Sequence, residues 1–316
     1  MKHIGILIQG PITSIGRNFE SSHPREFNCK TYVEKLHSDS LRLGCVPLLV
    51  TWQEKALDSL ELPAGDVLSF EYSETIFRNR RLNNWKSSKY KQFFLVLKGL
   101  EVLTDRQCDY VIKVRTDQQI NLSLLVDFVQ SSEELQSNRI LTLFADDRTI
   151  DQWPDFAFGG DPNFLKSLIS RYMNSKELHS SIHKDFFYSL LLDFRSPWRA
   201  FISKLLIPYR QRFSARQLKN IQTNWKDNFQ LMPMEVLQSL EWRGALFNRS
   251  DLEHYYGFEE FEEFINIIRE TKAKKNPFPI NLASIDALTI FFPSNVSDTV
   301  TKVKNGIVRR IKNLLC

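Results

Sequence analysis

The chain has 316 residues, of which 25% are charged and 42% hydrophobic, and these are the proportions of an ordinary soluble globular protein. Its length suffices for one large α/β core or two smaller ones. The net charge of +5 favours an anionic small molecule or an anionic membrane surface as a partner. The basic residues are scattered rather than gathered into a stripe, so we expect no nucleic-acid partner.

The chain opens with a short aliphatic run over residues 3–8, which predicts a central strand, followed by Gln9-Gly10-Pro11. Glycine allows a backbone to approach a ligand closely, and proline fixes the direction in which the chain leaves the strand. This turn is therefore a candidate ligand-binding loop, with an ordinary strand-to-loop stop as the alternative. It lacks the GxGxxG spacing of a dinucleotide-binding loop.

Helical spacing over residues 28–43 and strand-like composition over residues 45–52 and 67–70 predict a βαβ opening. The segment 75–91 is rich in Arg, Asn and Lys. It is interpreted either as a solvated loop or as a source of cations for phosphate groups. Residues 92–102 continue as an apolar helix.

The segment 109–119, DYVIKVRTDQQ, has the apolar and β-branched composition of a buried strand, with Lys113 as the exception. It stops abruptly in Arg115-Thr116-Asp117. In open α/β sheets, ligands lie at the carboxyl ends of the strands. A carboxylate in such a place can hold a divalent cation, which neutralises a diphosphate. The alternative is a strand that surfaces into a loop, with Arg115 and Asp117 as a surface ion pair.

A helix is predicted over residues 122–128 and a strand over residues 139–145. Asp155 then precedes a short aromatic strand that is followed by paired glycines and Asp161. An acidic residue here is a candidate general base if its surroundings desolvate it. For Asp161 we favour the simpler role of N-cap for a helix over residues 162–172.

Residues 175–230 have a helical and irregular pattern with many aromatic residues, whose expected role is core or lid packing. Glu235 lies in the first turn of a further predicted helix, where an acidic residue is favoured. Residues 300–316 form a basic amphipathic pattern. Such a helix binds an anionic bilayer surface or docks on its own domain, and the sequence leaves both alternatives open.

The four cysteines, Cys29, Cys45, Cys108 and Cys316, stand far apart without a CxxC pair. This pattern predicts neither a zinc site nor a disulfide framework, and it favours a reducing compartment. The apolar run at the amino terminus is too short for a signal peptide, and no stretch approaches the roughly 20 apolar residues of a membrane span. We expect a cytoplasmic protein, peripheral on the inner face of the cell membrane if its tail binds lipid.

Four segments, taken in order and spacing, resemble the WavE-type lipopolysaccharide-synthesis family, which is similar to glycosyltransferases of the GT-A fold. The segments are Gln9-Gly10-Pro11, Lys91-Gln92 ahead of Gly99-Leu100, Val114-Arg115-Thr116-Asp117, and Asp155 with Phe158-Gly159. The resemblance covers residues 1–161, and residues 232–237 give a further match. In the second segment a lysine replaces the family's arginine, and the family's preceding asparagine is not in place.

The resemblance implies an α/β fold, with a GT-A-like Rossmann-type mixed sheet flanked by helices and a helical C-terminal half. It implies a glycosyltransferase domain over residues 1–275, with a nucleotide-sugar half up to residue 160 and an acceptor or lid half beyond it. Residues 276–316 would then form a C-terminal extension that ends in the basic helix.

The implied activity is transfer of a sugar from a nucleotide-sugar donor to a lipopolysaccharide or another cell-surface polysaccharide, with a saccharide or lipid-linked acceptor. The implied donor-binding residues are Gln9, Gly10, Pro11, Lys91, Arg115 and Asp117. Asp117 would hold Mg or Mn against the leaving diphosphate.

For an inverting reaction, Asp155 is the first candidate for the base that accepts the proton of the acceptor hydroxyl, with Asp161 and Glu235 in reserve. A retaining reaction requires no such base, and the sequence does not choose between the two.

A second interpretation belongs to another class of protein. The chain would be a non-catalytic protein that binds a membrane surface or a polyanion, with the sheet only as a scaffold. Ligand-induced stabilisation separates the two interpretations, because only the enzyme should respond to nucleotides. A nucleotide-binding phosphotransferase is disfavoured, because the sequence lacks GxxxxGK[ST].

Overall fold

The computed structural model describes residues 2–21, 23–72, 88–132, 139–146, 151–174, 182–191, 215–247, 255–256 and 266. The chain divides into two compact units. The first comprises Met1–Leu191 and Ile221–Ile265, and the second Leu192–Asn220 and Asn266–Cys316. The central sheet and the candidate site belong to the first unit. The predicted boundary at residue 275 and the basic helix over 300–316 lie outside the described residues.

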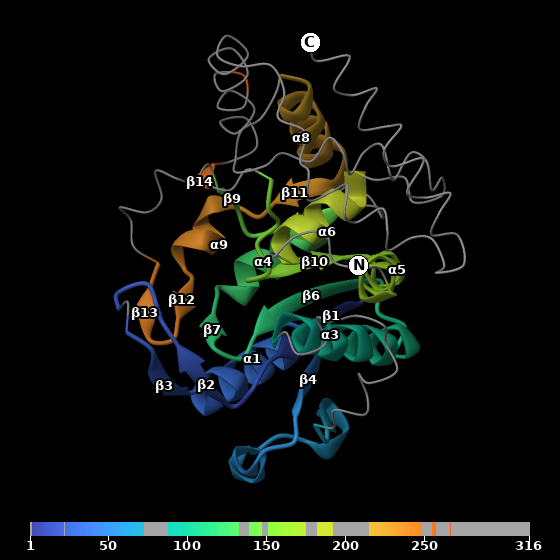
Figure 1. The fold of residues 1–316 in the computed structure, drawn as a ribbon. Coiled ribbons are helices and arrows are strands. Elements are labelled where there is room, and N and C mark those ends of the chain that lie inside the picture. The colour runs from blue at the N-terminus through green and yellow to red at the C-terminus, as the bar shows by residue number, and fades with distance from the viewer. Residues whose placement is uncertain are drawn as a thin grey trace, which may run out of the picture. The chain divides into compact units, whose positions relative to one another are not determined.

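Within the described residues, a seven-stranded mixed sheet forms the centre of the first unit (Figure 1). Its strand order is β11-β8-β10-β6-β1-β4-β5. Strand β10 is antiparallel to both neighbours, whereas the other neighbouring pairs are parallel. The strands are β1 (Ile4–Gln9), β4 (Val46–Trp52), β5 (Val67–Phe70), β6 (Tyr110–Arg115), β8 (Ile140–Thr142), β10 (Phe158–Gly160) and β11 (Phe229–Leu231).

Helices cover both faces of this sheet, because the side chains of a strand alternate between its two faces. The residues Ile4, Ile6 and Ile8 join one buried cluster with α1 (Lys30–Arg42) and α4 (Leu122–Ser131). On the opposite face, a Cβ at Gly5 would lie 3.0 Å from Leu103 of α3 (Ser88–Asp105), which in turn packs on α5 (Pro162–Asn174). The predicted α/β class, with a mixed Rossmann-type sheet flanked by helices, is confirmed.

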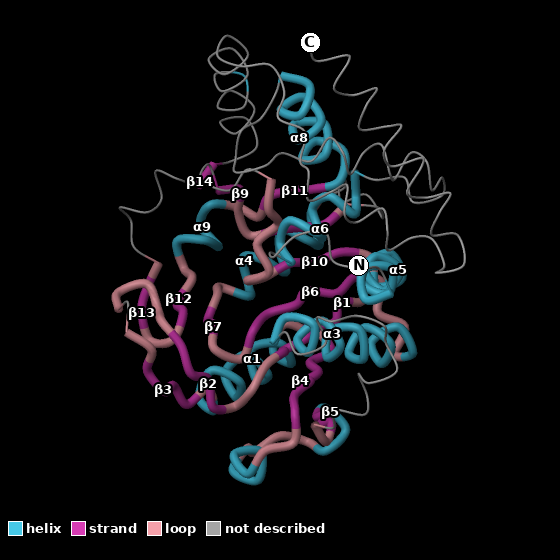
Figure 2. The backbone as a smooth tube through the Cα atoms, viewed as in Figure 1, coloured by secondary structure: helices cyan, strands magenta, loops and turns pink. Residues whose placement is uncertain are grey.

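The remaining elements lie around the sheet (Figure 2). They are the helices α6 (Ile182–Leu191), α8 (Ala215–Asn228) and α9 (Met234–Gln238), the 3₁₀ turns η1 (Lys55–Ser59) and η2 (Ala64–Asp66), and the strands β2 (Thr13–Gly16), β3 (Arg25–Asn28), β7 (Gln118–Gln119), β9 (Ala145–Asp146), β12 (Glu241–Trp242), β13 (Ala245–Leu246) and β14 (Tyr255–Tyr256). None of the described helices is both long enough and apolar enough to cross a membrane.

Two elements differ from the sequence-based expectation. The segment after β1, expected as a loop, contains the antiparallel pair β2–β3. Its side chains are mostly exposed, so it carries no alternating apolar pattern. Strand β11 lies in a stretch expected to be helical and irregular. Phe229 there is 1% exposed, and the strand pairs with β8. Tertiary pairing decides both segments, because strand formation depends on neighbours more than on local composition.

In the described part of residues 175–230, the side chains of Phe186, Phe187, Trp225 and Phe229 are buried in the core, as predicted. The ring of Phe186 in α6 stacks on that of Phe93 in α3 with their centroids 4.4 Å apart, and it also packs on Trp153. Trp153 in turn contacts Phe158 of β10 with centroids 4.7 Å apart. These residues are almost fully buried, so the cluster joins the helices of this face to the sheet.

We predict that Ile112→Ala in the central strand β6 lowers the free energy of unfolding by about 3 kcal/mol, because it empties space in a close-packed core. Ile112 is 0% exposed. The matched control is Ile15→Ala in β2, whose side chain is 70% exposed, and there the expected change is below about 0.5 kcal/mol. Urea denaturation of both variants measures the difference. Equal losses would contradict the assignment of β6 to the core.

Candidate active site at the carboxyl edge of the sheet

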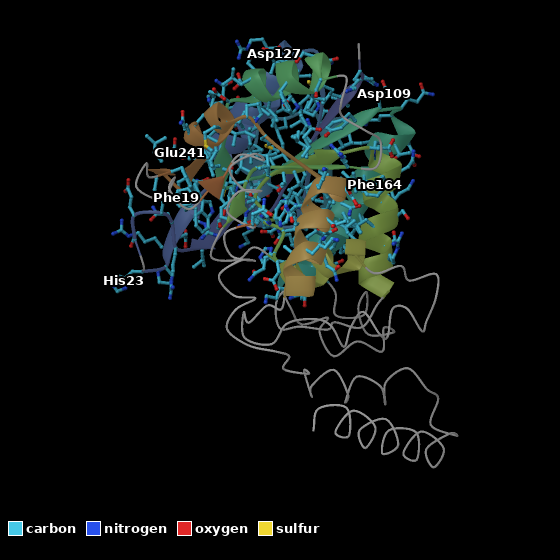
Figure 3. All side chains as sticks on the ribbon, turned by 90° about the horizontal axis from the view of Figure 1, so that it is seen from above. Phe19, His23, Asp109, Asp127, Phe164 and Glu241 are labelled. Carbon is cyan, nitrogen blue, oxygen red and sulfur yellow. The ribbon has the colours of Figure 1, made fainter. Side chains whose placement is uncertain are left out.

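The order of strands reverses between β1 and β6. From β1 the chain adds β4 and β5 on one side, and after α3 it returns to place β6 on the other side of β1. Ligands of open α/β sheets bind outside the carboxyl ends of the strands at such a switch point. Figure 3 shows Phe19 and Glu241 toward one side of the sheet and Asp109, the residue before β6, toward the other.

Two of the segments singled out in the sequence meet at this switch point. Gln9 of β1 lies beside Arg115 of β6 in the parallel register. The Thr116 amide donates to the carbonyl of Gln9 at 3.1 Å, and the Thr116 hydroxyl donates to the carbonyl of Pro11 at 2.7 Å. Gly10 has φ +140°, and a Cβ there would lie 2.5 Å from Thr116 Oγ1. Glycine is therefore required for the close approach of these two chain segments.

The side chain of Gln9 is 4% exposed. Its Oε1 has no hydrogen-bond partner within the described part of the chain. Such an orphaned amide is uncommon in a protein interior and marks a place where a ligand or water completes the bonding. The loop after Gln9 is held by Glu54, whose carboxylate accepts from the amides of Ile12 at 2.6 Å and Thr13 at 3.4 Å.

Asp117 is 1% exposed, and five donors surround its carboxylate. Arg115 donates from Nε and Nη2 at 2.9 and 3.0 Å. Arg243 Nε lies 2.9 Å away, Ser14 Oγ donates at 3.1 Å and Trp242 Nε1 donates at 3.2 Å. Burial by itself raises the pKa of the Asp117 carboxyl, but the charges and hydrogen bonds of Arg115, together with Arg243, outweigh it and lower the pKa to about 2.

Arg115 and Asp117 therefore do form the ion pair that the sequence offered as the alternative. The pair is not on the surface, because the side chain of Asp117 is 2% exposed. Two residues that reach Asp117 were not predicted from the sequence: Trp242, the last residue of β12, and Arg243, in the turn between β12 and β13. Arg243 and Gly244 have φ +51° and +76°, as a type I′ hairpin turn requires. The Arg-Gly pair was the only local signal of this turn, and nothing in it indicates that the turn lies against Asp117.

These residues do not fit a divalent cation. Four of the five donor atoms lie around Oδ2 and one donates to Oδ1, so a single lone pair of Oδ1 remains for a cation. Two guanidinium groups beside the carboxylate would also repel a metal ion. Among the described residues, no group of three or more His, Cys, Asp or Glu side chains is placed to hold a metal. The assignment of Mg or Mn to Asp117 stays a prediction.

Asp155 lies in a second polar cluster, and its residue is 7% exposed. Gln92 Nε2 of α3 donates to its Oδ2 at 3.0 Å, and His183 Nε2 of α6 lies 3.9 Å from its Oδ1. Lys113 Nζ of β6 donates to the carbonyls of Asp155 and Phe156 at 2.6 and 3.4 Å. The structure therefore joins two of the segments on which the resemblance rests, because Gln92 binds Asp155, and Lys113, the residue before the β6 segment, holds the peptide bond that follows Asp155.

Lys113 is 1% exposed. Burial lowers the pKa of its amine to about 7, and the negative charge of Asp155 partly opposes that fall. The sequence did give a signal for Lys113, which is the one charged residue among the apolar residues of the strand. His183 Nδ1 lies 2.9 Å from the carbonyl of Trp153. A carbonyl only accepts, so Nδ1 donates to it, and Nε2 is the ring nitrogen that faces Asp155.

Aromatic rings connect the two clusters. Phe156, the residue after Asp155, packs edge-on against Trp242 with centroids 5.2 Å apart, and Trp242 donates to Asp117. Phe19, from the loop between β2 and β3, contacts Trp242 at the same centroid distance. The carboxylates of Asp155 and Asp117 thus belong to one continuous assembly, which is built from both ends of the described chain.

The other predicted site residues lie apart from these contacts. The ammonium of Lys91 sits 4.1 Å from the centre of the Tyr72 ring. Asp161 Oδ1 accepts from the amide of Phe164 at 2.8 Å, which confirms that it caps α5. Glu235 is exposed in the first turn of α9. Within the described residues, no hydrogen bond or ion pair joins Lys91 or Glu235 to either cluster.

Comparison with known proteins adds little to this geometry. No protein-family model matches the chain, and no curated protein matches its sequence. Among solved structures, the chain is similar to the crystal structure of mannose-1-phosphate geranyltransferase from Thermus thermophilus, with a TM-score of 0.31 and 11% sequence identity. The match covers 60% of this chain and 68% of that chain. A likeness at this level carries no argument about activity.

We predict that Asp117 makes stability depend on pH in the acid range. Its folded-state pKa lies below the unfolded value of 3.8, so its contribution of about 2 kcal/mol is present above pH 4 and is lost as the pH falls toward 2. The gap in unfolding free energy between the wild type and Asp117→Asn should narrow from pH 5 to pH 3 in urea denaturation. Asp39→Asn, which alters an exposed ion pair with Arg42, is the control. A gap that is constant over this range would contradict the assignment.

Proposed function

We propose that the chain is a glycosyltransferase of the WavE type, which transfers a sugar from a nucleotide-sugar donor to a lipopolysaccharide or another cell-surface polysaccharide. One observation carries the proposal. Segments on which the resemblance rests are far apart in the sequence and meet in two pairs: Gln9 lies beside Arg115 at the switch point of the sheet, where α/β folds bind ligands, and Gln92 donates to Asp155. Contacts among these segments would be coincidental in a protein whose sheet is only a scaffold.

The donor would lie across the carboxyl ends of β1 and β6. The nucleoside would lie near the loop after β1, where the unpartnered amide oxygen of Gln9 offers an acceptor to a base or ribose group. Gly10 and Pro11 shape this loop, and Arg115 stands beside Gln9 in the neighbouring strand. Lys91 stays a predicted contact to the nucleotide-sugar donor. It lies in the first turn of α3.

In the inverting reaction, Asp155 would act as the general base. The acceptor hydroxyl oxygen forms a bond to the anomeric carbon as its proton passes to the Asp155 carboxylate. The bond between the anomeric carbon and the phosphate oxygen breaks, and the nucleoside diphosphate leaves with the electron pair. Gln92 orients the carboxylate, and Lys113 fixes the backbone on either side of the Asp155–Phe156 peptide bond. A retaining reaction would need no base at Asp155.

The remaining expectations belong to the same proposal. The acceptor would be a saccharide or a lipid-linked saccharide, and the basic helix over residues 300–316 would hold the protein on the inner face of the cell membrane. Glu235 is the reserve for the base. Its exposure gives no means of raising its basicity, so Asp155 is preferred.

We expect one nucleotide of a panel of UDP, GDP, CMP and dTDP to raise the melting temperature of the protein. A ligand that binds only the folded state stabilises it by about 2.7 kcal/mol at a concentration of about 100 Kd. Each nucleotide is tested with Mn and with EDTA, and ATP serves as the unrelated control. A flat panel from folded protein would contradict the proposal and favour the non-catalytic, polyanion-binding interpretation.

With the donor class in hand, we predict that Asp155→Asn lowers kcat by roughly 10²-fold to 10⁴-fold, because general-base catalysis contributes about that much. Nucleotide affinity should change little, since the carboxylate serves the acceptor. Asp127→Asn, at an exposed position on α4, is the control. Near-normal turnover by Asp155→Asn would remove the base assignment. If Glu235→Gln is the inactive variant instead, the base is Glu235.

A further inference from the structure

We infer that Arg115, Asp117 and Arg243 form a cation-independent binding site for the diphosphate of the donor. In this site Asp117 positions the two guanidinium groups and carries no metal. The inference rests on the proposed function, because it assigns the site of that reaction's leaving group. It replaces the metal expected from the sequence with two fixed positive side chains.

The charge of the cluster is the first argument. Two guanidinium groups share the carboxylate of Asp117, so these three side chains carry one net positive charge, and the carboxylate of Asp155 also acts on Arg115. The side chains of Arg115 and Arg243 are 22% and 11% exposed, and that of Asp117 is 2% exposed. An excess charge with so little water around it is costly unless an anion is bound. A diphosphate is a dianion and supplies that charge.

The second argument is the donors that the cluster leaves unused. Arg115 directs Nε and Nη2 to Asp117, which leaves its Nη1 without a partner in the described part of the chain. Arg243 Nε lies 2.9 Å from Asp117 and donates to Ser14, and Nη1 donates to the carbonyl of Arg17. Nη2 of Arg243 then has no hydrogen-bond partner in the part of the chain that the structure describes. Guanidinium groups match phosphate oxygens in geometry and keep their charge at every physiological pH.

The third argument is the set of contacts by which the fold places Arg243. Arg243 is the first central residue of the type I′ turn, with φ +51°. Asn18 donates to its carbonyl at 3.1 Å, and its guanidinium carbon lies 4.8 Å from the centre of the Trp242 ring. A Cβ at Gly16 would lie 2.7 Å from that carbon, so only glycine leaves room for the guanidinium.

The test measures binding of inorganic pyrophosphate by calorimetry in EDTA at low ionic strength. We expect binding by the wild type and a loss of affinity of roughly 10-fold to 100-fold in Arg243→Gln and in Arg115→Gln, since each removes charged hydrogen bonds. The matched control is Arg42→Gln, because Arg42 forms an exposed ion pair with Asp39. This substitution should leave the affinity for pyrophosphate unchanged.

A second variant guards against misfolding. Gly16→Ala keeps every charge and displaces the Arg243 guanidinium, so it should weaken pyrophosphate binding while thermal melting shows a folded protein. Binding that appears only after Mn is added would overturn the inference. So would equal affinity in the wild type, Arg115→Gln and Arg243→Gln.

The two proposals fail in different ways. If nucleotides bind and sugar is transferred only in the presence of Mn, the proposed function holds and the cation-independent site is overturned. If pyrophosphate binds in EDTA with the expected variant pattern and no nucleotide stabilises the protein, the anion site holds and the glycosyltransferase proposal fails.

Discussion

The ion cluster around the buried carboxylate of Asp117 holds together segments that the chain itself keeps far apart. Its donors come from β2, from the end of β6 and from the turn between β12 and β13. A carboxylate removed from water must be fully hydrogen-bonded, and its removal would leave two guanidinium groups without a counter-charge. The carboxylate of Asp117 ties both hairpins to the end of β6, and β12 is also held by its pairing with β7.

Strand β6 connects that cluster to the chemistry proposed for Asp155. Lys113 and Arg115 are two residues apart, so alternation along the strand places both on the face covered by α3. Lys113 binds the carbonyls that flank the Asp155–Phe156 peptide bond, and Arg115 binds Asp117. One strand thus carries a buried lysine toward the proposed base and an arginine toward the proposed leaving group. Displacing β6 would disturb both.

Local pattern was sufficient for much of the fold. The β-branched and aliphatic runs of β1, β4 and β6 are almost entirely buried, and such strands are identifiable from composition because nearly every position is apolar. The pair β2–β3 and the strand β11 were missed for the opposite reason. The first exposes most of its side chains, and the second is three residues long in a stretch with helical composition.

The sequence by itself determined the α/β class, and it singled out Gln9-Gly10-Pro11, Arg115, Asp117 and Asp155 as candidate site residues. These features are local, since each follows from residues that are neighbours in the chain. Only the tertiary structure decided what each group faces. Arg243 lies far along the chain from Asp117, and the spacing of such residues carries no record of their contact. The partners of a buried charge set its chemistry, and the two arginines that the carboxylate of Asp117 holds became visible only in the folded chain.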